Sequence, residues 1–383
     1  MEIYLDNSAT TKPYPEVIEA MASSMLFGYY NPAALYAPAV AAEHALAEAR
    51  AAVAAPLLMK QENVIFTSGG TESNNLAILG CLKRLRGGGT VLYSAAEHAA
   101  VRNACLEAEA MGFTVRQIPL DARGSLDLQA LEAMLDETVR LICVMQVCNE
   151  TGIVMPLKEV SVLRDRLAPQ AALHVDGVQG YLRLPLNMKQ LNIQTYAVSA
   201  HKVHGPKGMG ALIVQTGHKL RPLLVGGGQQ NGLRSGTDNT SGAAGFAAAV
   251  RRYPADAADT MRALKAQAVE SLQKAIPAAV TIGPGPEDAD SAPHILCVSI
   301  PPVKAETMVH ALAQENIIVG TGSACSSHAR KHSAVLTAMG VSPRLMDSAI
   351  RISFCDQNTE ADVQTAVRAM AEQYAVLSKF TRR

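Results

Sequence analysis

The sequence carries no excess of charge of either sign: its 383 residues include 34 basic and 34 acidic side chains, so the formal net charge is zero. A chain without net charge gives no electrostatic reason to expect a nucleic acid or a membrane surface as a partner. The start lacks the basic and apolar segments of a secretory leader, and the Ala-rich stretch over 37–55 is interrupted by charged residues, well short of the roughly 18 apolar residues of a membrane span. We therefore expect no export, no membrane association and no direct nucleic-acid binding.

Paired cysteines are also lacking. The seven cysteines form an odd count without a CxxC pair, which argues against a disulfide framework and against a structural metal site. Most of them stand in apolar surroundings, such as Cys143 in LICVM and Cys297 in HILCVSI, where a small core residue is expected. Cys325 is the exception, because it lies in the small-residue run GTGSACSSHAR. This cysteine usage favours a cytoplasmic location.

The sequence does contain a regular alternation of strand and helix patterns between about residues 60 and 215. Such an alternation is typical of an α/β fold with a mostly parallel sheet covered on both faces. A Pro/Gly-rich link over 281–293 precedes a smaller α+β pattern. Since the chain exceeds the usual size of one domain, we predict a large domain over 14–250 and a smaller one over 1–13 and 251–383. Strands are predicted over 63–68, 90–94, 113–118, 140–147, 171–176, 195–200, 295–300, 317–322 and 349–354.

A glycine-containing turn, TSGGTES over 67–73, joins a predicted strand to a predicted helix. Its free backbone N–H groups and the helix N-terminus suit a phosphate. A plain tight turn explains the same small residues equally well.

Polar residues follow the ends of several other predicted strands. Ligands of open α/β sheets bind beyond the carboxyl ends of the strands, so these residues form one candidate site. Lys202 can hold an aldehyde cofactor as a Schiff base, and Asp176 can keep a pyridine nitrogen protonated. Taken alone, Asp176 suits a helix N-cap and Lys202 a solvated surface position. The whole set is His98, Asn149, Asp176, Gln179, Ser199, His201 and Lys202.

Short motifs run through nearly the whole chain: YLDNSATT, TSGGTESNN, the EH of AAEHAAV, NETGIVMP, HVDGVQG, SAHKVHGPKGMGAL, GGGQQNGLRSGT, GSACSSH and RISF. In number and order they resemble the motifs of cysteine desulfurases, which belong to the class-V aminotransferase group of fold-type I pyridoxal-phosphate enzymes. The resemblance implies a PLP-dependent transferase of that fold type, with a mostly parallel sheet in the large domain and a smaller α+β domain.

The resemblance also implies a role for each site residue. Lys202 would bind pyridoxal 5'-phosphate covalently, His98 would stack on its ring, and Asp176 would pair with the ring nitrogen. Arg351 of RISF would bind the substrate carboxylate beside Asn149, although a surface ion pair is the commoner fate of an arginine. Gln179 and Asn149 would bond the ring hydroxyl side, and the phosphate would lie against Gly70, Thr71, Ser199 and His201, with Thr237 supplied by the partner subunit of a homodimer.

Cys325 occupies the position of the family's nucleophile. The resemblance implies that its thiolate takes the sulfur of L-cysteine, so that L-alanine leaves and a persulfide remains. The persulfide would pass to a sulfur-acceptor protein, for iron–sulfur cluster assembly or tRNA thiolation. Lys202 would act as acid and base, and His98 as a proton relay. Without the resemblance, a cysteine in such a run is more often part of an ordinary surface loop.

Two other functions compete with this one. An aminotransferase, or a selenocysteine or cystine lyase, shares the fold, and Cys325 discriminates because an aminotransferase has no use for a thiol at that position. A non-catalytic scaffold for sulfur assembly has no need of the set Lys202, Asp176 and His98. The chain also departs from the family pattern, with Cys355-Asp356-Gln357 after RISF where Gly-Arg is usual, and with NPAALY over 31–36 in place of NPSSxH.

Overall fold

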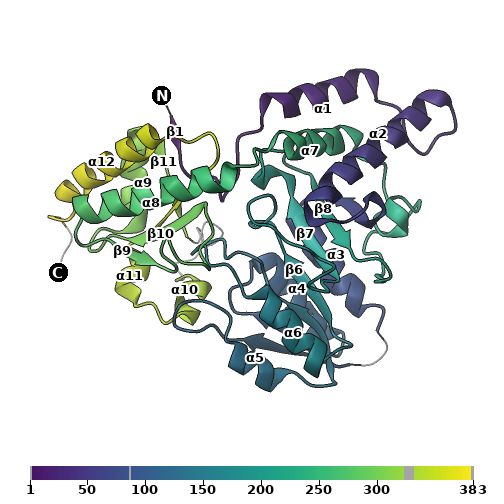
Figure 1. Cartoon of the computed structure of the whole chain (residues 1–383), viewed down its shortest axis with the longest axis horizontal. Coiled ribbons are helices and arrows are strands. Elements are labelled where there is room, and N and C mark those ends of the chain that lie inside the picture. Colours follow the sequence, from purple (N-terminus) through teal and green to yellow (C-terminus); the bar gives the residue numbers. More distant parts are fainter. Residues whose placement is uncertain (1, 86–87, 323–331, 381–383) are drawn as a thin grey trace.

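The structure, a computed structural model, describes residues 2–85, 88–322 and 332–380. The larger part of the molecule is built on a seven-stranded sheet of order β2-β8-β7-β6-β5-β3-β4 (Figure 1). Neighbouring strands are parallel, except that β8 runs antiparallel to both β2 and β7. The strands are β2 (Val64–Thr67), β3 (Thr90–Ser94), β4 (Thr114–Ile118), β5 (Val139–Cys143), β6 (Ala172–Asp176), β7 (Thr195–Ser199) and β8 (Gly210–Val214).

Helices cover both faces of this sheet, which explains why its central strands β6, β7 and β8 are buried along their whole length. One face packs into a core with Val53, Leu92 and Phe246, and the opposite face packs into a second core with Leu76 and Leu212. The helices of this part are α1 (Pro15–Phe27), α2 (Ala37–Ala54), α3 (Gly70–Leu82), α4 (Ala99–Ala110), α5 (Leu128–Met134), α6 (Leu157–Leu167) and α7 (Thr240–Arg252), with short 3-10 turns η1 (Ala55–Leu57), η2 (Gln61–Asn63), η3 (Ala200–Lys202) and η4 (Gln230–Gly232).

The smaller part has a four-stranded antiparallel sheet of order β12-β13-β10-β9 and a parallel pair of β1 with β11. Its core is separate and includes Leu5, Met261 and Phe354, so the first strand of the chain packs with the last third. The elements are β1 (Ile3–Tyr4), α8 (Ala257–Ala275), β9 (Val280–Ile282), β10 (Ile295–Ser299), α9 (Ala305–Gln314), β11 (Ile317–Ile318), β12 (Gly320–Thr321), α10 (Ala334–Ala338), α11 (Pro343–Asp347), β13 (Ala349–Ser353) and α12 (Glu360–Leu377).

The predicted α/β class with a mostly parallel sheet is confirmed, and two of the predicted strands are wrong in extent. The stretch 317–322 forms two strands, because β11 pairs with β1 whereas β12 pairs with β13. Strand β5 ends at Cys143, four residues early, and the chain beyond it turns Met145 and Val147 toward a cavity. Strands β1, β8 and β9 were not predicted, and β9 overlaps the start of the predicted Pro/Gly-rich link. The domain bounds at residues 13 and 250 stay a prediction, which the separate cores favour. No helix in the described part of the chain is long and apolar enough to cross a membrane.

Candidate active site

A cavity of about 520 Å³ lies at the carboxyl ends of the parallel strands, where both parts of the molecule and the N-terminal segment meet. The predicted site residues converge there from six different strand ends and turns. Cys325 lies outside the described residues, and Thr237 is exposed and is not among the residues that line the cavity. The predicted residues that do line it are Gly70, Thr71, His98, Asn149, Asp176, Gln179, Ser199, His201, Lys202 and Arg351.

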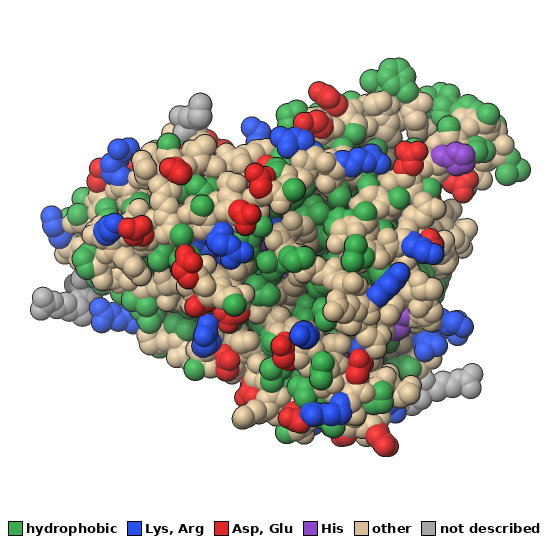
Figure 2. Space-filling model, in the orientation of Figure 1, with side chains coloured by type: hydrophobic (Ala, Val, Ile, Leu, Met, Phe, Trp, Pro, Cys, Tyr) green, Lys and Arg blue, Asp and Glu red, His purple; other side chains and the backbone are tan. Residues whose placement is uncertain are grey.

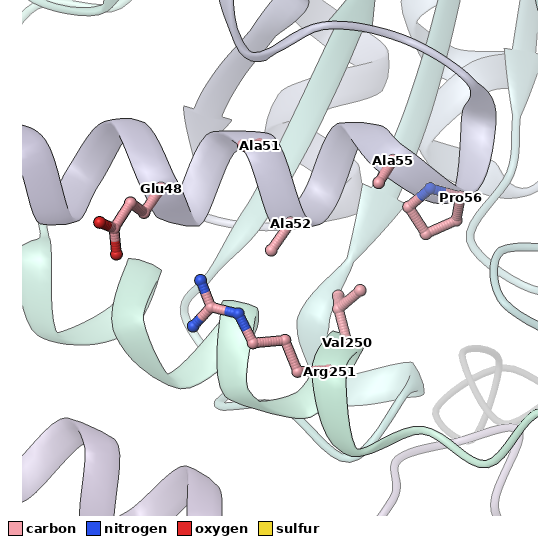
Figure 3. Close-up of a pocket in the computed structure, with 7 residues that line it drawn as sticks. All are labelled: Glu48, Ala51, Ala52, Ala55, Pro56, Val250 and Arg251. Atoms are coloured by element: carbon pink, nitrogen blue, oxygen red, sulfur yellow. The ribbon is translucent and has the colours of Figure 1, made fainter.

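A second hollow, of about 480 Å³, lies between α2 and α7. Figure 3 shows that small side chains such as Ala52 and Ala55 line much of it, with Glu48 and Arg251 toward one end. Among the described residues, no thiol, hydroxyl, histidine or amide side chain lines this hollow. The chemistry of the chain therefore points to the first cavity.

Lys202 ends the short turn η3, which directly follows β7. Its Nζ donates to two backbone carbonyls of the N-terminal segment, Ser8 O at 2.6 Å and Ala9 O at 2.8 Å. Burial, followed by the positive charges of the nearby Arg351 and Arg183, lowers the pKa of Lys202 to about 8. A lysine with such a pKa is partly a free amine near neutral pH, and a free amine can attack a carbonyl.

Asp176 is the last residue of β6, and both of its carboxylate oxygens accept hydrogen bonds. Oδ1 accepts from the backbone N–H of Val178 at 3.0 Å, and Oδ2 accepts from Nδ2 of Asn74 at 2.7 Å. Glu97 also lines this cavity, but unlike Asp176 it accepts a hydrogen bond on only one carboxylate oxygen. Its Oε1 accepts from the Met145 N–H at 2.6 Å, and its Oε2 has no hydrogen-bond partner among residues 2–85, 88–322 and 332–380. Burial, followed by the nearby Asp176, raises the pKa of Glu97 well above its usual value.

The N-terminus of α3 opens onto the same cavity through Gly70 and Thr71. Within the described chain no acceptor takes the N–H of either residue, so both donors are available to a ligand. A side chain at position 70 is excluded, because its Cβ would lie 2.8 Å from Cγ2 of Val178. His201 stands beside this turn with Nδ1 3.1 Å from Oγ1 of Thr10, and burial lowers its pKa to about 4, so the ring is neutral. The turn is thus a concave anion site.

His98 is the N-cap of α4, and its Nδ1 accepts the N–H of Ala100 at 3.1 Å. Burial lowers the pKa of His98, so the neutral ring keeps its proton on Nε2. Gln179 donates from Nε2 to Ser8 O at 3.0 Å, and its Oε1 lies 3.2 Å from Nε2 of the buried His294. His294 was not selected in the sequence, because it stands directly before the apolar strand β10 and follows no strand end.

Arg351 lies on β13 of the smaller part and is buried. Its Nη2 donates to Oδ1 of Asp6 at 2.8 Å, and Nη1 donates to Asn149 O at 3.0 Å. Nε is buried and has no partner in the described part of the chain. The predicted substrate-binding arginine therefore faces the cavity while an acidic residue, Asp6, orients it. Asp6 was missed, although it lies inside the motif YLDNSATT.

Neither departure from the family pattern lines the cavity. Asp356 accepts from the Tyr14 hydroxyl at 2.9 Å and lies 3.1 Å from Nε2 of His204. These two contacts connect the end of β13 to the N-terminal segment, through Tyr14, and to the turn after β7, through His204. The 31–36 segment lies between α1 and α2 and exposes Leu35 almost completely. The first departure serves internal packing, and the second shapes an outer surface.

Comparison with known proteins extends the likeness over the full chain. The family model of aminotransferase class-V matches residues 3–365. A NifS/IcsS protein homolog of Lactobacillus delbrueckii subsp. bulgaricus is 36% identical, with 98% of each chain covered, and a cysteine desulfurase of Trichormus azollae is 35% identical, with 97% of this chain and 92% of the relative covered. Among solved structures, a NifS-like protein superposes with a TM-score of 0.91 at 33% identity over 98% of this chain and 100% of that one. A structure described as SspA in complex with cysteine has a TM-score of 0.80 at 30% identity, over 94% and 100%.

Proposed function

Because the chain belongs to the aminotransferase class-V family, we infer that it is a cysteine desulfurase, an enzyme that removes the sulfur of L-cysteine and leaves L-alanine. The observation that carries this function is the single cavity that joins Lys202, Asp176, His98 and Arg351. Curated relatives named cysteine desulfurase, about 35% identical over nearly the full length, support the same conclusion.

We propose pyridoxal 5'-phosphate as the cofactor, because the donors of this cavity fit its functional groups. The unsatisfied N–H groups of Gly70 and Thr71 suit the phosphate, with Ser199 and His201 beside them. The lowered pKa of Lys202 suits covalent binding of the aldehyde, and the carboxylate of Asp176 suits a protonated ring nitrogen. When bound, such a cofactor supplies an electron sink for the substrate's Cα.

The amine of Lys202 then removes the Cα proton of the substrate and returns a proton later. The carbonyls of Ser8 and Ala9 hold this amine in the cavity whenever it is free, as they hold it here. His98 offers a proton from Nε2, because its Nδ1 is occupied by a backbone N–H. Gln179 and Asn149 lie on the ring hydroxyl side by resemblance, and both line the cavity.

Arg351 binds the carboxylate of L-cysteine in this proposal. Asp6 and the Asn149 carbonyl occupy Nη2 and Nη1, so the unpartnered Nε is the donor that a substrate carboxylate would satisfy. Leaving this buried N–H without an acceptor costs stability, and a bound carboxylate removes that cost.

Cys325 is proposed as the sulfur acceptor. Its thiolate bonds to the substrate sulfur as the C–S bond breaks, the electron pair stays with the carbon skeleton, and that skeleton gains protons and leaves as alanine. The persulfide passes to an acceptor protein, whose pathway is iron–sulfur cluster assembly or tRNA thiolation. Cys105 donates a hydrogen bond from its Sγ to Sγ of Cys143 at 3.7 Å, and both are free thiols, which fits the reducing cytoplasm that we propose for this chemistry.

We also propose a homodimer in which Thr237 reaches the phosphate of the partner subunit. Its exposure, away from the cavity of its own subunit, supports this placement. The surface where α1 ends and α2 begins supports dimerisation too, because hydrophobic side chains gather there at the upper right of Figure 2. Phe27 is 76% exposed and Leu35 is 97% exposed, and apolar patches of this kind mark protein interfaces.

The Cys325→Ser variant tests the function. It should bind pyridoxal 5'-phosphate and L-cysteine as the wild type does, yet form essentially no alanine or persulfide, because a hydroxyl is a far poorer nucleophile toward sulfur than a thiolate. Alanine is measured together with the sulfide that an added thiol reductant frees from the persulfide, and mass spectrometry after a cysteine pulse without the reductant locates the added sulfur. Cys355→Ser is the matched control and should keep its activity. Alanine release at the wild-type rate by Cys325→Ser would replace the desulfurase with a lyase.

A further inference from the structure

Asp176 is connected to a chain of buried polar side chains that runs away from the cavity. His174 and Asp176 are two residues apart on β6, so their side chains point to the same face of the sheet. Asn74 of α3 lies over that face and bridges them: its Nδ2 is 2.7 Å from Oδ2 of Asp176, and its Oδ1 is 3.0 Å from Nε2 of His174. Nδ1 of His174 lies 2.9 Å from Oγ1 of Thr195, its register partner on β7. All four residues are buried.

The donors in this chain can point in only one direction. A carboxylate only accepts hydrogen bonds, so Asn74 presents its NH₂ group to Asp176 and its oxygen to His174. Nε2 of His174 must then carry the proton, which leaves the lone pair of Nδ1 to accept the hydroxyl of Thr195. Each donor therefore points toward Asp176.

We propose that Thr195, His174 and Asn74 form a directional hydrogen-bond relay that holds Asp176 as a carboxylate aimed at the ring nitrogen of the cofactor. Thr195 and His174 are thereby positioning residues, which act on the cofactor through Asn74 and Asp176. The inference rests on the proposed function, because it presupposes pyridoxal phosphate in this cavity.

Comparison with Glu97, the other carboxyl group deep in the cavity beside Asp176, indicates what the relay does to the charge of Asp176. Two nearby carboxylates do not both ionise readily in a buried site. Glu97 has one backbone N–H on Oε1 and no partner for Oε2 within the described ranges, whereas Asp176 has a donor on each oxygen. The negative charge of the pair is therefore placed on Asp176. Burial lowers the pKa of His174 to about 3, which keeps the relay free of a competing positive charge.

Thr195→Val is the sharpest test, because valine keeps the shape and removes only the hydroxyl that donates to His174. Thr90→Val is the matched control: Thr90 is also a buried threonine at the start of a strand of the same sheet, but its Oγ1 faces Thr138 at 3.0 Å. Two quantities are measured on each holoenzyme, the dissociation constant of pyridoxal phosphate and the pH midpoint of the visible band of the bound cofactor.

We expect Thr195→Val to weaken cofactor binding about five-fold, the effect of losing one buried hydrogen bond, and Thr90→Val to leave it unchanged. The pH midpoint should move upward only in Thr195→Val. When the ring nitrogen is less fully protonated, its positive charge is smaller. The proton on the nitrogen that joins Lys202 to the cofactor is then repelled less, so that nitrogen loses its proton at a higher pH.

His174→Gln and His174→Leu extend the test. Glutamine can still donate to Asn74, so the pH midpoint of His174→Gln should lie close to that of the wild type, whereas the midpoint of His174→Leu should be shifted. If His174 served only the packing of the core, the two variants would not differ in this way. An unchanged midpoint in Thr195→Val, or an equal shift in Thr90→Val, would overturn the relay. A wild-type protein that binds no cofactor on Lys202 would instead overturn the proposed function, so the two failures are distinguishable.

Discussion

Lys202 should react with the cofactor as an amine whose pKa is about 8, because burial and two neighbouring arginines disfavour its charged form. At pH 7 a group with this pKa is a free amine in about one molecule in eleven, whereas a lysine with the ordinary pKa of about 10.5 is free in about one in 3,000. The protein environment thus raises the reactive fraction roughly 300-fold at neutral pH.

The assay follows the uptake of pyridoxal phosphate by the apoprotein from pH 6 to pH 10, with borohydride trapping and peptide mapping to locate the product. Uptake should rise with pH as the ammonium loses its proton and should level off above about pH 8. A simple primary amine in the same buffers corrects for the titration of the cofactor itself. Lys202→Ala should show no trapped product.

Arg351→Met should move the midpoint of this profile to higher pH, because Arg351 is the nearby cation that most lowers the pKa of Lys202. Lys207→Met, which removes an exposed lysine from the same segment, is the control and should leave the midpoint in place. A corrected rate that still climbs tenfold per pH unit at pH 10 would refute the argument, as would trapping on another lysine.

Three further outcomes are expected. Arg351→Met should raise the KM for L-cysteine by roughly ten- to a hundred-fold, since a charge-assisted hydrogen bond contributes about 1.5–3 kcal/mol. Steady-state alanine formation measures the KM, and an unchanged KM would show that Arg351 does not bind the substrate. Leu35→Asp should weaken both self-association and cofactor retention, because in the proposed dimer Thr237 would reach the partner's phosphate. A fully loaded monomer in sedimentation would contradict this. Asp356→Asn should cost about 1–3 kcal/mol of unfolding free energy at pH 7 in urea titrations. Burial alone would raise the pKa of Asp356, but hydrogen bonds from His204 and Tyr14 lower it, so this stability should fade as the pH falls toward the carboxyl's range. A stability difference that persists at pH 3 would argue against these contacts of the carboxylate.

The sequence by itself determined the α/β class and most of the cavity. Lys202 and Asp176 could be predicted as neighbours because each follows a strand of a mostly parallel sheet, and such strands place their carboxyl ends at one edge. Ordered motifs supplied the family, and the family supplied the chemistry. Cys325 could be predicted as the nucleophile from its motif, and it stays a prediction because it lies outside the described residues.

Only the tertiary structure decided how these residues are held. The carbonyls of Ser8 and Ala9 receive the Lys202 ammonium across more than 190 residues of sequence, and a backbone carbonyl leaves no trace in residue type. Asp6 reaches Arg351 across 345 residues, because β1 packs with the last third of the chain. The link from Thr195 to Asp176 likewise depends on strand register and on the helix above it, and neither follows from local pattern. Residues that perform chemistry are marked by their type at a strand end, whereas residues that orient them are marked only by contact.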